Sequence, residues 1–116
     1  MKTRNTTLQS LLAFDRSLDQ IRQDLAGYPW DSENPVVTLD RKKFAAILRR
    51  FLSGEFSASE IEDWANIVEG REDIGIEAVY EEMIEELIFA LANPVLAGDI
   101  SYPKVSNWVD KLEMEN

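Results

Sequence analysis

The sequence contains no cysteine and no histidine. Without cysteine, the chain can form no disulfide and offers no thiolate as a nucleophile or zinc ligand. Without histidine, catalytic triads that use imidazole and histidine-liganded metal sites are excluded as well. The five glycines form neither of the glycine-rich motifs that cradle nucleotide phosphates. We therefore expect no catalytic residues, no metal and no cofactor.

Long apolar runs are also missing. The longest uncharged run, Leu87–Gly98, has 12 residues and contains Pro94, whereas a membrane-spanning helix needs about 20 apolar residues. Asp15, Arg16 and Asp19 interrupt the N-terminal stretch before a secretory apolar core could form. We therefore expect a cytoplasmic protein that does not associate with membranes.

Basic residues are scarce, with 12 lysines and arginines against 22 acidic residues and a net charge of −10. Such a balance disfavours nonspecific attraction to nucleic-acid phosphates or to anionic lipid. A basic protein is the natural complement of this chain, and we expect no nucleic-acid partner.

The 116 residues, 45% of them hydrophobic, fit one domain. Apolar residues recur at helical spacing in five segments, and no segment shows sustained strand alternation. The pattern predicts a single domain over residues 1–116 with an all-α fold, a compact bundle of about five amphipathic helices. The expected helices lie at roughly residues 7–26, 40–54, 57–70, 77–92 and 101–112.

Several local signals support these segments. Ser57 and Glu60 fit a capping box, Gly54 and Gly70 are suited to helix ends, and Asn93-Pro94 prevents continuation of the fourth helix. Residues 36–39 are β-prone but short and isolated, so we predict no sheet.

The tryptophans fall into two groups. Trp64 and Trp108 lie on apolar stripes and are expected in the core. Trp30 lies in a proline-containing loop, where it either plugs the base of the bundle or forms an exposed anchor for binding.

The negative charge is concentrated in the second half of the chain. Residues 55–86 hold twelve acids and a single base, Arg71, whereas residues 1–54 carry more bases than acids. At 100° per residue, the glutamates of residues 81–86 point away from the apolar side of their helix. The candidate partner-binding residues are Glu62, Asp63, Glu69, Glu72, Asp73, Glu77, Glu81, Glu82, Glu85, Glu86 and Trp30.

This charge has two interpretations. Glutamates favour helices and solubility, so the acidic face could simply be solvated. Dense carboxylates facing one way also accelerate encounter with a cationic surface. Arg71 is expected to order the connector at residues 71–76 by pairing with Glu72, Asp73 or the carboxylates of the following helix.

Other chemistry fits the residues poorly. The glutamates of residues 81–86 lie on an outer face without the histidines of di-iron bundles, and residues 72–77 lack the spacing of a calcium loop. A hydrolase that uses paired carboxylates stays formally open.

The stretch Arg50–Glu60, continued by Trp64-Ala65-Asn66 and by Glu69–Ile74, resembles small acidic helical bacterial proteins. These include suspected immunity proteins of contact-dependent growth inhibition and polymorphic toxin systems. The resemblance covers roughly residues 39–100. It implies a cytoplasmic inhibitor that binds one cognate toxin domain, often a basic nuclease, and blocks its active site or its substrate groove.

We therefore expect a non-enzymatic immunity protein whose acidic surface neutralises a cognate basic toxin domain. The alternative is a helical regulatory adaptor or oligomeric scaffold whose acidic face serves only solubility. The sequence leaves the oligomeric state open.

Overall fold

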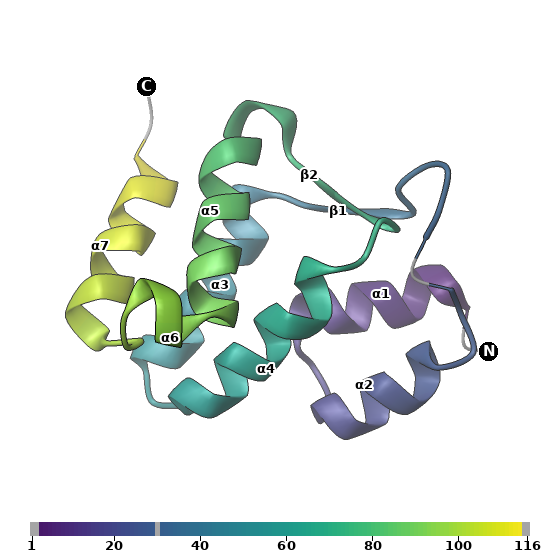
Figure 1. Cartoon of the computed structure of the whole chain (residues 1–116), viewed down its shortest axis with the longest axis horizontal. Helices are drawn as coiled ribbons and strands as arrows, with labels where there is room; N and C mark the ends of the chain where they lie inside the picture. Colours follow the sequence, from purple (N-terminus) through teal and green to yellow (C-terminus); the bar gives the residue numbers. More distant parts are fainter. Residues whose placement is uncertain (1–2, 30, 115–116) are drawn as a thin grey trace.

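The structure is a computed structural model that describes residues 3–29 and 31–114. In chain order the elements are α1 (Arg4–Ala13), α2 (Leu18–Leu25), β1 (Val37–Leu39), α3 (Arg41–Leu52), α4 (Ala58–Glu69), β2 (Ile74–Ile76), the 3-10 turn η1 (Ala78–Tyr80), α5 (Glu81–Ala92), α6 (Pro94–Ala97) and α7 (Tyr102–Glu113). α4 packs along α5, and α7 packs along α3. α5 lies between α4 and α7, with α3 behind it (Figure 1).

The prediction of a mostly helical chain is confirmed, but the prediction of a purely helical bundle of about five helices is wrong. The described residues form seven α-helices and a two-stranded sheet. One reason is that the segment expected as a single helix, residues 7–26, forms both α1 and α2. α1 begins earlier than expected because Thr3 and Thr6 form a reciprocal capping box.

The break between α1 and α2 lies at Phe14, whose backbone is left-handed with a φ of 49°. This conformation is uncommon for a residue with a side chain, so the surroundings must hold it in place. The Phe14 ring stacks on Phe56 with 4.1 Å between ring centroids. The Arg50 guanidinium donates hydrogen bonds to the carbonyl oxygens of Ala13 and Phe14, at 2.6 and 3.0 Å. Ser17 then caps the N-terminus of α2.

The sheet pairs two segments that are far apart in the sequence. β1 and β2 run parallel, with Val37 opposite Ile74 and Leu39 opposite Ile76, and α3 and α4 form the connection between them. The β-prone segment at residues 36–39 is therefore not isolated. Gly75 is required in β2 because a Cβ atom there would lie 2.9 Å from Cβ of Pro35.

The second half of the chain follows the predicted segments more closely. The segment 77–92 starts as η1 before α5 begins at Glu81. Pro94 starts the short α6, which ends at Gly98 with a φ of 100°. α7 begins after its cap Ser101.

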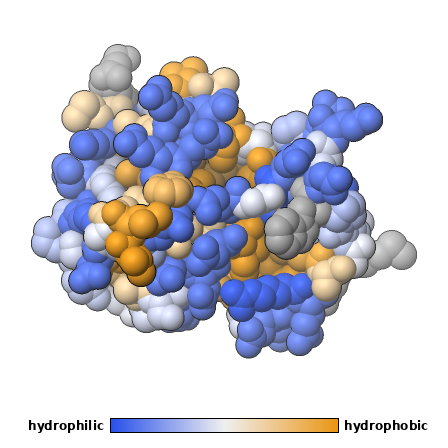
Figure 2. Space-filling view, viewed as in Figure 1, coloured by the Kyte–Doolittle hydropathy of each residue, from blue (hydrophilic) through white to orange (hydrophobic). Residues whose placement is uncertain are grey.

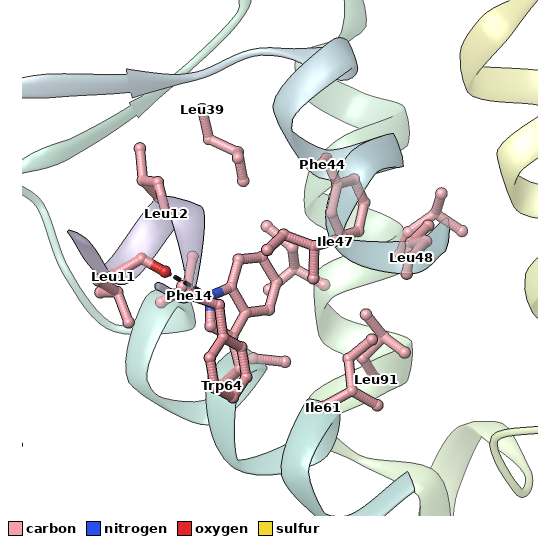
Figure 3. Close-up of a cluster of buried hydrophobic side chains, with 14 of the residues drawn as sticks. Leu11, Leu12, Phe14, Leu39, Phe44, Ile47, Leu48, Ile61, Trp64 and Leu91 are labelled. Carbon is pink, nitrogen blue, oxygen red and sulfur yellow. Dashed lines mark hydrogen bonds between the residues drawn. The ribbon is translucent and has the colours of Figure 1, made fainter. Parts of the chain in front are cut away.

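Trp64 lies at the centre of the hydrophobic core (Figure 3). It is fully buried, and its indole Nε1 donates a hydrogen bond to the carbonyl oxygen of Leu11 at 2.7 Å. Its ring stacks on Phe44 with 6.0 Å between centroids. The prediction for Trp64 is confirmed. Trp108 is only half-buried and packs at the edge of the core.

Candidate protein-binding surface

Carboxylates gather on the outward sides of α4, α5 and the connector between them. Six of them are exposed and Glu62 is half-buried. Figure 2 shows hydrophilic residues covering much of the outward side of α5. We call this set the acidic surface: Glu62, Glu69, Glu72, Glu81, Glu82, Glu85 and Glu86.

The carboxylates of α5 border two different grooves. Glu85 lines a groove of about 330 Å³ together with Glu69 of α4 and with Phe89. Glu82 and Glu86 line a groove of about 500 Å³ between α5 and α7. α5 therefore places acidic side chains on both sides of one exposed ridge.

The acidic surface is not neutralised by the basic residues of the described chain. None of the ion pairs within 4.0 Å among these residues includes a member of the acidic surface. Some acids elsewhere are paired, for example Glu55 with Arg50 and Glu113 with Arg49. Like charges one helical turn apart on α5 cost a few tenths of a kcal/mol each. Salt bridges within the fold therefore do not account for these carboxylates.

Asp73 does not belong to this surface. Its side chain is fully buried, and both carboxylate oxygens accept hydrogen bonds from Arg71, at 3.0 and 2.9 Å. Arg4 donates a further bond to it at 3.1 Å. Arg4 and Arg71 also donate to the carbonyl oxygen of Pro29, which fastens the loop before β1. The pairing predicted for Arg71 is confirmed, while the assignment of Asp73 to an exposed surface is corrected, because the group is enclosed by two arginines.

Two other candidates, Glu77 and Asp63, also stand apart from the acidic surface. Glu77 is half-buried, and its Oε1 accepts a hydrogen bond from the backbone N–H of Arg41 at 2.9 Å, so it caps α3. Asp63 is half-buried and lies one turn before Ile67, which lines a groove with Leu25 of α2. Asp63 therefore lies on the α2 side of α4. Trp30 lies outside the described residues.

An exposed apolar patch on α6 was not predicted from the sequence. Val95 is 96% exposed and Leu96 is 76% exposed. Figure 2 shows this patch as a hydrophobic area below the hydrophilic side of α5. The sequence does contain a signal for this patch, the apolar residues between Pro94 and Gly98. A helix as short as this run cannot bury all of its apolar side chains.

The described residues contain no group of three or more aspartates and glutamates arranged to hold a metal ion. Within the same part of the chain, every helix is too short or too polar to cross a membrane.

Comparison with known proteins gives no relative. No protein-family model matches the chain, and neither the curated proteins nor the solved structures contain a significant match.

Proposed function

We propose that this chain is a non-enzymatic immunity protein that binds and neutralises a cognate basic toxin domain through the acidic surface. The observation that carries the proposal is that these seven carboxylates are without an ion-pair partner among the described residues. That the basic partner is a toxin domain is taken from the resemblance described above for residues 39–100.

The physical basis is electrostatic steering. An uncompensated negative face attracts a cationic domain over a distance of about one Debye length, roughly 8 Å at physiological salt. Such steering raises association rates about 10- to 1,000-fold and loses strength as salt is added. A toxin nuclease with a basic substrate groove is a suitable target. The carboxylates of the acidic surface could take the place of the phosphates of the nucleic-acid substrate in that groove.

The test starts from the neighbouring reading frames. An upstream gene for a large secreted protein supplies the candidate toxin, whose C-terminal domain is expressed with and without this chain while growth is measured. We expect the chain to restore growth and to bind the toxin domain with an association rate that falls steeply between low and moderate salt. Failure to protect against a toxic neighbouring domain, or an operon without any such gene, would refute the proposal.

Charge reversal locates the interface. A triple variant, Glu72→Lys, Glu82→Lys and Glu85→Lys, should lose both protection and fast association. The control is a second triple variant with the same change in net charge on the α1–α2 half of the molecule, where Asp19, Asp31 and Glu33 are exposed. Equal loss in the two variants would show that net charge matters and that the acidic surface does not.

The apolar patch on α6 favours a second candidate, an oligomeric scaffold or adaptor. Val95 and Leu96 have no cover in the described chain, and exposed apolar residues that gather in one place often mark protein contacts. Sedimentation velocity of the chain alone, with Leu96→Ser for comparison, separates the candidates. A dimer that Leu96→Ser converts to monomer favours the scaffold, and a monomer at all concentrations counts against it.

A further inference from the structure

The groove between α5 and α7 combines an apolar lining with an acidic rim. α7 packs along α3, and the space left between α7 and α5 measures about 500 Å³. The apolar lining includes Met83, Leu87 and Trp108, of which Leu87 is buried and the other two are half-buried. Glu82 and Glu86 form one side of the rim, and both are exposed.

We propose that this groove receives an arginine side chain from the basic partner, with its guanidinium against Glu82 and Glu86 and its methylene groups on the apolar lining. The inference rests on the proposed function and names the chemical group that the acidic surface recognises. It assigns a specific anchoring point within a surface that otherwise acts only through its general charge.

The spacing of the two carboxylates suits a guanidinium. Glu82 and Glu86 are one helical turn apart, with about 5–6 Å between their Cβ atoms. The planar fork of arginine presents five N–H donors and can bond two carboxylates at once, whereas lysine offers one compact and strongly hydrated charge. The long stem of arginine can lie on apolar surface while its head stays among polar groups.

Three cations lie near the groove, and none of them forms an ion pair with Glu82 or Glu86 in the described chain. Arg41 lies over the ring of Tyr80, 4.7 Å from its centroid, and donates hydrogen bonds to the carbonyl oxygens of Leu112 and Met114. Lys111 lines the groove but forms no ion pair among the described residues. Lys104 places its Nζ 5.9 Å from the centroid of the Trp108 ring and donates a hydrogen bond to the carbonyl oxygen of Ala97 at 3.2 Å. Neither amine is paired with Glu82 or Glu86.

The groove on the other side of α5 is a poorer candidate for the same ligand. It is lined by Glu69 and Glu85 but also by Arg71, which already carries a guanidinium. That guanidinium is committed to the buried carboxylate of Asp73. Arg71 is fixed in place there, whereas the Lys111 side chain of the α5–α7 groove is exposed and held by no ion pair in the described chain. The α5–α7 groove is also the larger of the two, so it is the better fit for an arginine side chain.

The inference can be tested with a small probe and the full chain. The probe is the blocked peptide acetyl-Gly-Arg-Gly-amide, and the controls are the same peptide with lysine or with glutamine in place of arginine. Binding is followed at low salt by NMR, through the indole N–H of Trp108 and the methyl group of Met83. We expect saturable shifts of both signals with the arginine peptide, weaker binding of the lysine peptide and no response to the glutamine peptide.

Two double variants distinguish binding of the peptide in the groove from a general effect of the protein's negative charge. Glu82→Gln with Glu86→Gln should weaken binding of the arginine peptide about fivefold, since two exposed ion pairs contribute about 0.5 kcal/mol each. Glu62→Gln with Glu69→Gln removes the same charge from the acidic surface outside the groove and should weaken it less than about twofold. All four substitutions replace partly or fully exposed side chains, and thermal unfolding verifies that each variant is folded.

Three results would overturn the inference. If both double variants weaken binding of the arginine peptide equally, only a general electrostatic attraction to the acidic surface is left. If the lysine peptide binds as well as the arginine peptide, the groove does not select arginine. A dimer of the chain alone that Glu82→Gln with Glu86→Gln dissociates would make a second copy the occupant. Each of these can occur while the chain still protects against a toxin, so failure of the groove and failure of the proposed function are distinguishable.

Discussion

Replacing Asp73 by asparagine removes a negative charge from a position without access to solvent. In the native structure its carboxylate accepts hydrogen bonds from Nε and Nη2 of Arg71 and from Nε of Arg4, at 3.0, 2.9 and 3.1 Å. Its backbone carbonyl also accepts from the N–H of Val36 at 2.8 Å. The residue therefore joins α1, the loop before β1 and the start of β2.

The expected loss of stability follows from Arg71, whose charge is unpaired in the variant. The Arg71 side chain is only 5% exposed, so the variant leaves a buried guanidinium without its counter-charge. Breaking a buried pair in this way typically costs about 3–5 kcal/mol. Single domains are stable by about 5–15 kcal/mol in total, so this one substitution should remove a large part of the free energy of unfolding.

Urea unfolding measures this loss. With an m-value of about 2 kcal/mol per molar urea, the midpoint should fall by about 2 M. Glu72→Gln is the matched control, because Glu72 is the exposed neighbour of Asp73, and it should change the free energy of unfolding by less than about 0.5 kcal/mol.

A double variant keeps the reasoning testable if Asp73→Asn does not fold. Arg71→Met with Asp73→Leu removes both buried charges and leaves apolar groups of similar size. Such replacements are often neutral or stabilising, so the double variant should be more stable than Asp73→Asn. A cost of less than about 1 kcal/mol for Asp73→Asn, or a double variant that is the less stable of the two, would refute the account.

Three further predictions concern stability and are checked by the same measurement. Gly75→Ala should lower the free energy of unfolding by about 1–3 kcal/mol, because its new Cβ would lie 2.9 Å from Cβ of Pro35. Gly27→Ala is the control and should be neutral or stabilising, since a Cβ there would have no atom within 4 Å. Equal effects of the two substitutions would contradict the close approach of Gly75 to Pro35. Thr7→Val should raise the free energy of unfolding by about 1 kcal/mol, because the buried Thr7 hydroxyl has no hydrogen-bond partner in the described chain. A loss of stability would instead indicate that this hydroxyl forms a hydrogen bond. Arg50→Met should cost about 1–3 kcal/mol by removing the donors to the two carbonyls that end α1, and an unchanged midpoint would mean that solvent replaces them.

Helix positions were predictable where local signals agreed. The capping box at Ser57 and the proline after Asn93 both mark helix ends that the structure has. The break between α1 and α2 was missed because the apolar spacing continues across it, although Ser17 and Gln20 form a capping pattern that indicates a second start. The left-handed Phe14 depends on Phe56 and Arg50, which lie about 40 residues away, so no local pattern could reveal it.

The sheet and the sorting of the carboxylates depend on contacts between distant segments. β1 and β2 are three residues each and pair across α3 and α4, so neither is recognisable without the other. Asp73 and Glu72 are adjacent and equally acidic in the sequence, yet one is buried between arginines and the other is exposed. Burial and partners separate structural from surface carboxylates, and both are set by the tertiary fold.

This separation changes how the binding proposal must be tested. A charge-reversal set that included Asp73 would abolish binding through unfolding and would seem to support the acidic surface. Exposed carboxylates chiefly speed association and set its salt dependence, whereas affinity usually comes from a few well-packed anchors. The α5–α7 groove is the larger of two places on the acidic surface where carboxylates and apolar side chains occur together. Tight binding that is insensitive both to salt and to Glu82 and Glu86 would therefore place the interface elsewhere, with the exposed α6 patch as the next surface to examine.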